Sequence, residues 1–378
     1  MKKVLLFMLL LIIPIRCFGK ELIPNAKSGI LIEANTGKII YEKDKDIELS
    51  VASMTKMVAQ IIILEEIEKG NIKWTDKVTV SRNAADMGGS QIYLKEGEVM
   101  SVEDLMKGIS VASGNDATVA MAEYISGSEE KFVERMNDVV KKLGLKHTKF
   151  KNVTGLDEKG HYSSSYDMGI IAKELVTKHS SILKFSSIYE DYLREDTDNK
   201  FWLVNTNKLV SLYDGTDGLK TGHTDDAGYC LAATVKRGDL RLIAIVLGEE
   251  DSKIRNSETM ELLDYGFNNV KLKKLKDKND IIKRISINKA NKKYIGLYLK
   301  DNLNVVEDVG DNNKYKYNVK INKIKLPIDK NSVLGRIDVI SKNKVIISGN
   351  LISKDKIDKL SIFDLYKENL SNLIFGIL

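Results

Sequence analysis

Ser53 and Lys56 lie three residues apart in the stretch LSVASMTKMVA, a spacing that places two side chains on one face of a helix. A serine hydroxyl must lose its proton to attack a carbonyl, and a neutral lysine can take that proton. Because the reference pKa of lysine is about 10.4, burial or a second cation must first lower it. At the start of a helix, the serine N–H is also free to face an oxyanion. The pair therefore suggests acyl transfer through a serine without a histidine base.

The surroundings of this pair distinguish it from others in the chain. The same spacing occurs at Ser128/Lys131, Ser181/Lys184, Ser286/Lys289, Ser341/Lys344 and Ser353/Lys356. Most of these competitors are flanked by charged residues or lie in the C-terminal region. The neighbours of Ser53, in contrast, are the small or apolar residues Val51, Ala52, Met54, Met57 and Val58. Such neighbours can bury the turn and desolvate Lys56, as a lysine base requires.

Two triplets further along the chain add polar groups. The triplet SGN, from Ser113 to Asn115, follows the apolar run ISVA and opens the helix-like segment NDATVAMA. The triplet KTG, from Lys220 to Gly222, occurs once in the chain, before a strand pattern at 229–235. The three motifs together are far less common than a serine and a lysine at helical spacing.

Other catalytic signatures are absent from the sequence. There is no G-x-S-x-G nucleophile elbow and no H-E-x-x-H zinc motif, and the histidines have no metal-ligand spacing. We interpret His147, His161, His179 and His223 each as a surface histidine or as one whose hydrogen bonds are satisfied. Cys230 lies in the apolar run GYCLAATV and is expected to be a buried structural thiol.

The composition is that of an ordinary globular protein. With 378 residues, 43% hydrophobic and 30% charged, the chain is long enough for two domains of roughly 150 residues each. The net charge of +6 is modest and no nucleic-acid-binding motif is present, so no nucleic acid partner is expected. We interpret the lysine-rich segment 271–293 as solvated surface.

The N-terminus has the order of a secretory signal. Lys2 and Lys3 precede an apolar run at 4–15, and Cys17-Phe18-Gly19 offers small residues at the two positions that a signal peptidase reads. The run is shorter than the ~20 residues that span a bilayer, so we expect a cleaved signal peptide over 1–19. The alternative is a buried N-terminal helix. The signal predicts a location outside the cytoplasm.

The residues with catalytic potential need a scaffold, and strand patterns occur near both ends of the first 267 residues. Residues 28–44 form two β-rich runs around a turn at 35–37, and further strands are expected at about 228–235 and 241–247. Helical patterns occur at about 53–69, 102–108, 115–125, 129–143, 166–178 and 252–267. This order predicts one mixed α/β (α+β) domain over 25–267, with a helical insertion between the strands.

The C-terminal part differs in pattern. Runs such as IGLYL, YKYNVKI and NKVIIS predict short strands and hence a second, all-β domain over 270–355. In the last segment Ile362, Tyr366 and Leu370 recur at four-residue steps, which predicts an amphipathic helix over 359–378. This helix is too short and polar to span a bilayer. It either lies on the outer face of the cytoplasmic membrane or packs on the β domain.

In the order S-x-x-K, S-x-N and K-T-G, the chain resembles the penicillin-binding serine D-Ala-D-Ala carboxypeptidases. It is similar in particular to the low-molecular-weight type, which carries a C-terminal β domain and an amphipathic tail. The stretches MGGSQIYLKEGE, NVTGLDEKGHYSS, NTNKLV and DGLKTGHTDDAGYC carry the likeness over about 25–267. The resemblance implies a serine β-lactamase/transpeptidase-like domain followed by a small all-β domain.

The resemblance also implies roles for the motif residues. Ser53 would be the acylated nucleophile and Lys56 its base, and Ser113 would relay protons toward the leaving group. Asn115 would hold the peptide amide and help to fix Lys56. The backbone N–H groups of Ser53 and His223 would form the oxyanion hole.

Substrate contacts are implied in the same way. Lys220 would keep the site electropositive and, with Thr221, bind the terminal carboxylate of the substrate. Gly222 would let the substrate backbone approach the strand edge, and Arg255 matches a carboxylate-binding arginine of some relatives. No metal or organic cofactor is implied.

The expected function is that of an exported D-Ala-D-Ala carboxypeptidase that trims peptidoglycan stem peptides, contributes to wall maturation and cell shape, and is acylated by β-lactams. Two alternatives remain. A serine β-lactamase would need a carboxylate-activated deacylating water, and no loop that provides it is recognisable in the sequence. A catalytically silent wall-binding protein would not need the complete set of motif residues. Whether water or an amine accepts the acyl group, as in an endopeptidase or transpeptidase, is left open.

Overall fold

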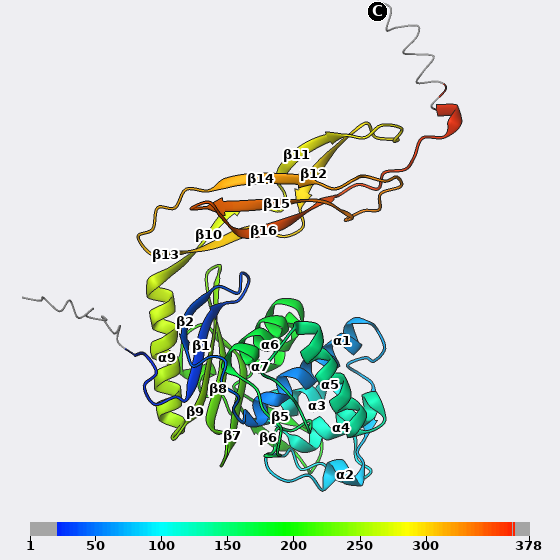
Figure 1. The fold of residues 1–378 in the computed structure, drawn as a ribbon. Coiled ribbons are helices and arrows are strands. Elements are labelled where there is room, and N and C mark those ends of the chain that lie inside the picture. Colours follow the sequence, from blue (N-terminus) through cyan, green and yellow to red (C-terminus); the bar gives the residue numbers. More distant parts are fainter. Residues whose placement is uncertain (1–20, 365, 367–378) are drawn as a thin grey trace, which may run out of the picture.

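The computed structural model describes residues 21–364 and residue 366, and it divides into two domains joined by a long helix (Figure 1). The expected signal peptide and the expected tail helix beyond residue 366 lie outside the described residues. Within the described part of the chain, no helix is both long and apolar enough to cross a bilayer.

The first domain is built on a five-stranded antiparallel sheet whose strand order is β2-β1-β9-β8-β7. Its strands are β1 (Ser28–Glu33), β2 (Ile39–Lys43), β7 (Thr216–Thr224), β8 (Gly228–Arg237) and β9 (Leu240–Glu249). The N-terminal hairpin therefore pairs with a strand from the end of the domain, through the β1–β9 ladder. This confirms the mixed fold expected from strands at both ends of the segment.

Both faces of this sheet are buried, because successive side chains of a strand point to opposite faces. Ile30 and Ile32 belong to the core between the sheet and the helical region, whereas Leu31 belongs to the core under helix α9 (Ser252–Asn269). Strand β9 alternates in the same way along Leu242–Leu247. Figure 1 shows α9 on one side of the sheet and helices such as α1, α4, α5 and α6 on the opposite side.

The helical region fills the chain between β2 and β7. Its main helices are α1 (Lys56–Glu68), α3 (Val102–Lys107), α4 (Asn115–Ser126), α5 (Glu129–Leu143) and α6 (Ser165–Lys178). Shorter helices are α2 (Arg82–Ala85), α7 (Leu183–Ser186) and α8 (Leu209–Leu212). Two-stranded ribbons pair β3 (Lys77–Thr79) with β4 (Val99–Ser101) and β5 (Glu190–Leu193) with β6 (Phe201–Val204). Tight turns of 3₁₀ geometry occupy Ala52–Thr55 and Ser180–Ile182, and a π-helical turn occupies Gly108–Ala112.

The second domain is all-β, as the sequence pattern predicts. A five-stranded sheet in the order β11-β12-β16-β15-β14 and a ribbon of β10 with β13 enclose a separate hydrophobic core. The strands are β10 (Val270–Lys276), β11 (Ile281–Ser286), β12 (Tyr294–Leu299), β13 (Leu303–Asp308), β14 (Lys316–Ile321), β15 (Val333–Ser341) and β16 (Lys344–Ser353).

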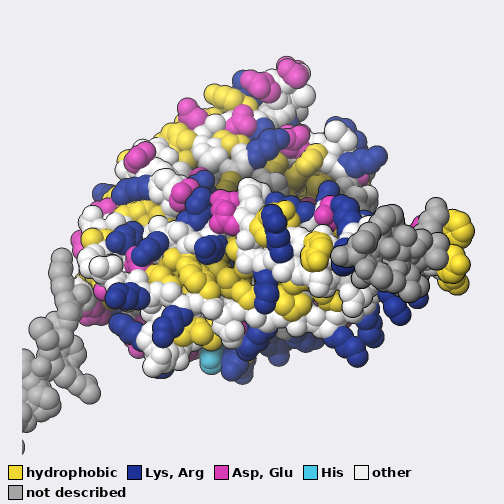
Figure 2. Space-filling view, turned by 90° about the horizontal axis from the view of Figure 1, so that it is seen from above, with side chains coloured by type: hydrophobic (Ala, Val, Ile, Leu, Met, Phe, Trp, Pro, Cys, Tyr) yellow, Lys and Arg dark blue, Asp and Glu magenta, His cyan; other side chains and the backbone are white. Residues whose placement is uncertain are grey.

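The surface at the β-domain end is rich in lysine and arginine. Viewed from this end, Figure 2 shows basic side chains spread over the face, with hydrophobic side chains gathered between them. Exposed apolar residues of this domain include Val333, Val345 and Ile346. Much of the lysine-rich segment 271–293 is exposed, in agreement with a solvated surface.

Candidate active site

The expected nucleophile stands on a tight turn where the sheet meets the helical region. Ser53 lies in the 3₁₀ turn that precedes α1, and Lys56 is the first residue of that helix. The apolar neighbours are buried, as their side chains predict; they are Val51, Ala52, Met54, Met57 and Val58. The Lys56 side chain is 0% exposed as a result.

Lys56 is within hydrogen-bond distance of Ser53. Its Nζ lies 2.7 Å from Ser53 Oγ and 2.7 Å from the carbonyl oxygen of Thr154. The Ser53 hydroxyl lies a further 3.5 Å from the same carbonyl. A base in direct contact with a nucleophile, and oriented by a third group, is the arrangement of an activated serine.

The environment of Lys56 favours the neutral amine. Burial lowers the pKa of Lys56 well below its ordinary value, and the nearby charge of Lys220 lowers it further. The carboxylate of Asp116 acts in the opposite direction, but it accepts hydrogen bonds from the backbone N–H groups of Ile92 and Leu94 instead of from Lys56. Burial and the charge of Lys220 thus act toward the neutral amine that a general base needs.

The segment that supplies the Thr154 carbonyl packs directly on the nucleophile turn. A Cβ at Gly155, whose φ is +84°, would collide with the carbonyl of Ala52. His161, at the end of the same segment, is buried and places its Nε2 2.8 Å from Thr55 Oγ1. This close docking positions the Thr154 oxygen against Lys56.

The SGN triplet contains two buried polar atoms that have no hydrogen-bond partner among the described residues. Ser113 follows the π-helical turn and has a left-handed φ of +63°, and α4 begins at Asn115. Asn115 Nδ2 donates to the carbonyl of Gly88 at 2.7 Å. The two atoms are Ser113 Oγ and Asn115 Oδ1, and neither forms a hydrogen bond with any described residue. Buried polar groups are nearly always satisfied, so a substrate or water is the natural partner of both.

The KTG triplet lies within strand β7, which the sequence pattern did not predict, and it precedes the expected strand at 229–235, which is β8. The pattern was obscured because β7 carries glycines and polar residues in place of an apolar run. Lys220 is 1% exposed, and its Nζ donates to the carbonyl of Thr221 at 3.0 Å. Burial, together with the charge of Arg255, lowers the pKa of Lys220 to about 7.

Gly222 and Thr221 face the other motifs. A Cβ at Gly222 would lie 2.6 Å from the carbonyl oxygen of Val51, so only glycine allows β7 to approach the nucleophile turn. Thr221 Oγ1 donates to Thr206 Oγ1 at 2.8 Å. The His223 ring stacks on Tyr229, with ring centroids 4.0 Å apart.

A cavity of about 450 Å³ connects these groups. It is lined by Ser53, Ser113, Thr221, Gly222, His223 and Arg255, among others. The structure thus brings residues from all three motifs and Arg255 to one site. Lys56, Asn115 and Lys220 are buried around it. No aspartate or glutamate is among the described residues that line this cavity.

Sequence reasoning missed three parts of the site. Thr154 contributes a backbone carbonyl, which has no side-chain signature. His161 is a satisfied histidine, as expected, but its partner Thr55 lies between the nucleophile and its base. Thr206 belongs to the segment NTNKLV, which carried part of the family likeness, and that likeness was the available signal. Among the described residues, no cluster of three or more histidine, cysteine or acidic side chains is suited to a metal ion.

The fold and the site define a serine acyl-transfer enzyme of the penicillin-binding class. The sequence family described as D-alanyl-D-alanine carboxypeptidase matches residues 20–251, and the C-terminal domain of penicillin-binding protein 5 matches residues 271–359. The chain therefore belongs to the D-alanyl-D-alanine carboxypeptidase family, with the penicillin-binding protein 5 type of C-terminal domain.

Relatives agree with this assignment. The chain is 46% identical over 354 residues to D-alanyl-D-alanine carboxypeptidase DacF of Bacillus subtilis, covering 93% of this chain and 91% of that protein. The structure of penicillin-binding protein 5 from Haemophilus influenzae superposes with a TM-score of 0.73 at 31% identity, covering 89% of this chain and 98% of that one. A penicillin-binding protein of Listeria monocytogenes, solved in its ampicillin-bound form, matches 64% of this chain and 98% of its own, at 30% identity and a TM-score of 0.58.

Proposed function

We propose that Ser53, activated by Lys56, removes the terminal D-Ala from peptidoglycan stem peptides that end in D-Ala-D-Ala. The observation that carries the proposal is the contact of 2.7 Å between a fully buried lysine amine and the serine hydroxyl. Family membership supplies the reaction class, and the cavity supplies room for a peptide end.

The chemistry proceeds by acylation and hydrolysis. Lys56 Nζ takes the proton of Ser53 Oγ as this oxygen attacks the carbonyl of the penultimate D-Ala. The C–N bond then breaks, and Ser113 relays a proton to the amine of the departing D-Ala. Water attacks the ester on Ser53 and releases the shortened peptide. The N–H groups of Ser53 and His223 stabilise the oxyanion in both steps.

The terminal carboxylate of the substrate is bound by the cations at one end of the site. Lys220 and Thr221 hold it, and Arg255 adds a second positive charge at the cavity wall. Binding a carboxylate favours the charged form of Lys220, which burial otherwise disfavours. Asn115 holds the amide on the other side of the scissile bond.

A β-lactam enters the same reaction, because its strained amide acylates Ser53. The absence of a carboxylate among the described lining residues favours a long-lived adduct over the rapid turnover of a β-lactamase. A β-lactamase of the common type uses a glutamate to activate the deacylating water. This difference separates the proposal from its main alternative.

Mass spectrometry after incubation with benzylpenicillin tests the proposal. We expect one stable adduct on the peptide that carries Ser53, and D-Ala release from diacetyl-L-Lys-D-Ala-D-Ala that the Ser53→Ala variant lacks. Rapid release of hydrolysed penicillin would support the β-lactamase instead. Unchanged D-Ala release by Ser53→Ala would contradict the assignment of the nucleophile.

We also propose that the protein is exported and that residues 359–378 attach it to the outer face of the cytoplasmic membrane. In the described beginning of this segment, Ile362 is 88% exposed and Tyr366 is 65% exposed. The basic surface of the β domain (Figure 2) suits anionic lipid headgroups. Deletion of 359–378 should release the protein from membranes and leave D-Ala release intact. Membrane retention of the shortened protein would refute the attachment.

A further inference from the structure

The backbone at Tyr93 is held in an unusual conformation from two sides. Its φ of +57° is an outlier for a bulky residue. The N–H groups of the flanking Ile92 and Leu94 donate to the buried carboxylate of Asp116 at 3.0–3.1 Å. The Arg194 guanidinium donates to the carbonyls of Ile92 and Tyr93, at 3.1 and 3.4 Å. Strained backbone persists where the surroundings over-determine it, and such places cluster at ligand clamps.

The hydrogen bonds of Asp116 and Arg194 to the backbone at 92–94, called the Tyr93 clamp below, leave the Tyr93 ring exposed to solvent. The residue is 65% exposed, and its ring forms an edge-to-face pair with the Phe201 ring, with centroids 5.6 Å apart. Packing of the side chain therefore does not explain why the conformation is maintained. An exposed ring on a rigid support is a good contact for a ligand, because little conformational entropy is lost when it binds.

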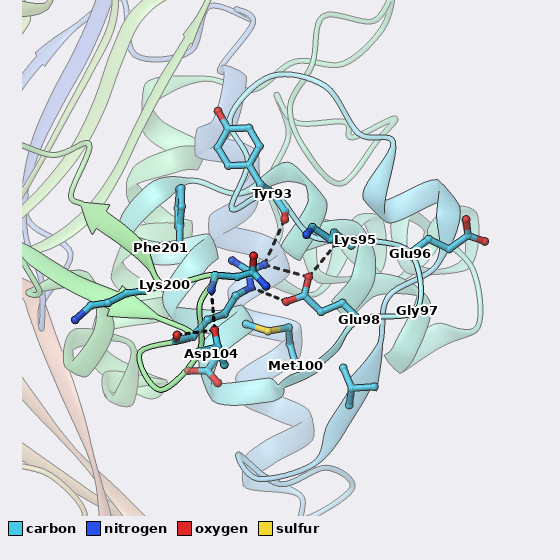
Figure 3. A pocket seen from close by; sticks show the side chains of 13 residues that line it. Tyr93, Lys95, Glu96, Gly97, Glu98, Met100, Asp104, Lys200 and Phe201 are labelled. Atoms are coloured by element: carbon cyan, nitrogen blue, oxygen red, sulfur yellow. Dashed lines mark hydrogen bonds and ion pairs between the residues drawn. The ribbon is translucent and has the colours of Figure 1, made fainter.

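A cavity of about 770 Å³ opens beside this ring. It lies between the loop 93–100 and the β5–β6 hairpin, and an ion pair joins its two walls: Arg194 Nε lies 2.5 Å from Glu98 Oε1. Figure 3 shows Tyr93 and Phe201 together on one side, with Met100 and Asp104 on another. The lining combines aromatic rings with charges of both signs. Such a lining suits the polar groups of a peptide better than it suits a lipid chain.

The second cavity and the candidate active site are lined in part by the same two chain segments. Ser90 and Val204 line the active-site cavity, whereas Tyr93 and Phe201 line the second one. Each pair is three residues apart in sequence, so the chain can separate its members by at most about 10 Å. The Tyr93 clamp is also joined to the candidate active site through helix α4, because Asp116 directly follows Asn115 at the start of this helix.

We propose that the second cavity is a distal subsite for the amino-terminal part of the stem peptide, with Tyr93 as its main contact. The inference rests on the proposed function. The terminal carboxylate is assigned to the Lys220 and Arg255 side, so the acyl part of the substrate leaves past Asn115 and Ser90. A distance of about 10 Å is covered by about three extended residues upstream of the penultimate D-Ala. The stem residues before D-Ala-D-Ala reach that far, and a short tripeptide does not.

A comparison of two substrates tests the subsite. The probes are diacetyl-L-Lys-D-Ala-D-Ala and the pentapeptide L-Ala-γ-D-Glu-L-Lys-D-Ala-D-Ala, and the measurement is kcat/KM for D-Ala release by the full chain. Tyr93→Ala should lower kcat/KM for the pentapeptide by about three- to ten-fold, the range of one aromatic contact. It should leave the tripeptide value within about two-fold, and Tyr93→Phe should retain the preference for the pentapeptide, because the ring remains.

Tyr294→Ala is the matched control, because Tyr294 is 69% exposed on the β domain and lies on β12, away from both cavities. An equal fall for both substrates in Tyr93→Ala would mean that the residue only supports Asn115, and would overturn the subsite. No fall for either substrate would overturn it as well. If the wild-type protein releases no D-Ala from the tripeptide, the proposed function itself fails, which is a separate result.

Discussion

His161 Nε2 lies 2.8 Å from Thr55 Oγ1, so a buried histidine contacts the residue between the nucleophile and its base. The other ring nitrogen, Nδ1, accepts a hydrogen bond from the backbone N–H of Lys151 at 3.2 Å. A backbone N–H can only donate, so Nδ1 is unprotonated and the proton is on Nε2. The neutral ring thus connects the nucleophile turn to the segment that carries the Thr154 carbonyl.

The burial of His161 makes the free energy of unfolding depend on pH. Burial lowers the pKa of His161 to about 4, against about 6.5 for a free histidine. The unfolded chain binds a proton between these values and the folded chain does not, so stability falls as pH falls from about 6.5 to 4. The loss amounts to about 3 kcal/mol at most, at 1.36 kcal/mol per pKa unit. Thermal unfolding between pH 4 and 7 measures it.

Two variants separate this effect from general acid denaturation. His161→Gln keeps one donor and one acceptor but does not titrate, so it should flatten the pH dependence and retain penicillin acylation. His161→Leu leaves Thr55 Oγ1 and the Lys151 N–H without partners, and acylation should slow. Identical pH profiles for the wild type and His161→Gln would contradict the assignment to His161.

The Lys56→Arg variant tests the need for a neutral amine. Arginine stays positively charged because it does not lose its proton in proteins, so it cannot act as the base. We expect the rate of acylation by a fluorescent penicillin to fall about 10²- to 10⁴-fold, the usual contribution of a general base. Lys69→Arg, at the exposed C-terminal end of α1, is the control and should acylate normally. Near-normal acylation by Lys56→Arg would assign the base to another group.

The position of Lys220 predicts the direction of a pH shift. Acylation requires neutral Lys56, so its rate rises with pH through the pKa of this lysine. Because the charge of Lys220 helps to lower that pKa, Lys220→Ala should move the acid limb of the profile to higher pH. The measurement is the pH at half-maximal acylation rate, which is independent of weaker binding. Lys208→Ala removes another cation at the cavity and should not move the limb. An unmoved limb in Lys220→Ala would show that the two lysines are not coupled.

Gly155 and Gly160 form a matched pair in one segment. Both have left-handed φ values, +84° and +86°, but a Cβ at Gly155 meets the Ala52 carbonyl, whereas one at Gly160 is 3.5 Å from the nearest atom, on Lys151. Gly155→Ala should destabilise the fold by about 1–3 kcal/mol more than Gly160→Ala, the typical cost of overpacking. It should also slow acylation, because the nucleophile turn must move. Equal melting temperatures and equal acylation rates would contradict this packing.

The sequence was most informative where local composition sets burial. The apolar neighbours of Ser53 predicted a desolvated Lys56, and they bury it completely. The apolar runs of β1 and β9 predicted strands, and the sheet closes the domain from both ends. These features depend on side-chain type, which the sequence states directly.

Features that depend on the backbone could not be predicted in this way. Thr154 acts through its carbonyl, and Ser113 owes its place to a left-handed turn after a π-helical segment. Strand β7 contains KTG but has few of the residues that favour strands, and it is held by pairing with β8. The positions of the Thr154 carbonyl, Ser113 and β7 depend on tertiary contacts, which local sequence patterns do not reveal.

Helix α9 connects the two domains without a flexible linker. Arg255 lies in its first turn at the cavity wall, and the strand β10 starts directly after its last residue. At about 1.5 Å per residue, its 18 residues form a rod of about 27 Å. Its length sets the distance between the β domain and the mouth of the cavity, wherever the β domain is attached. Inserting or deleting residues in α9 would change the reach of the enzyme as well as its fold.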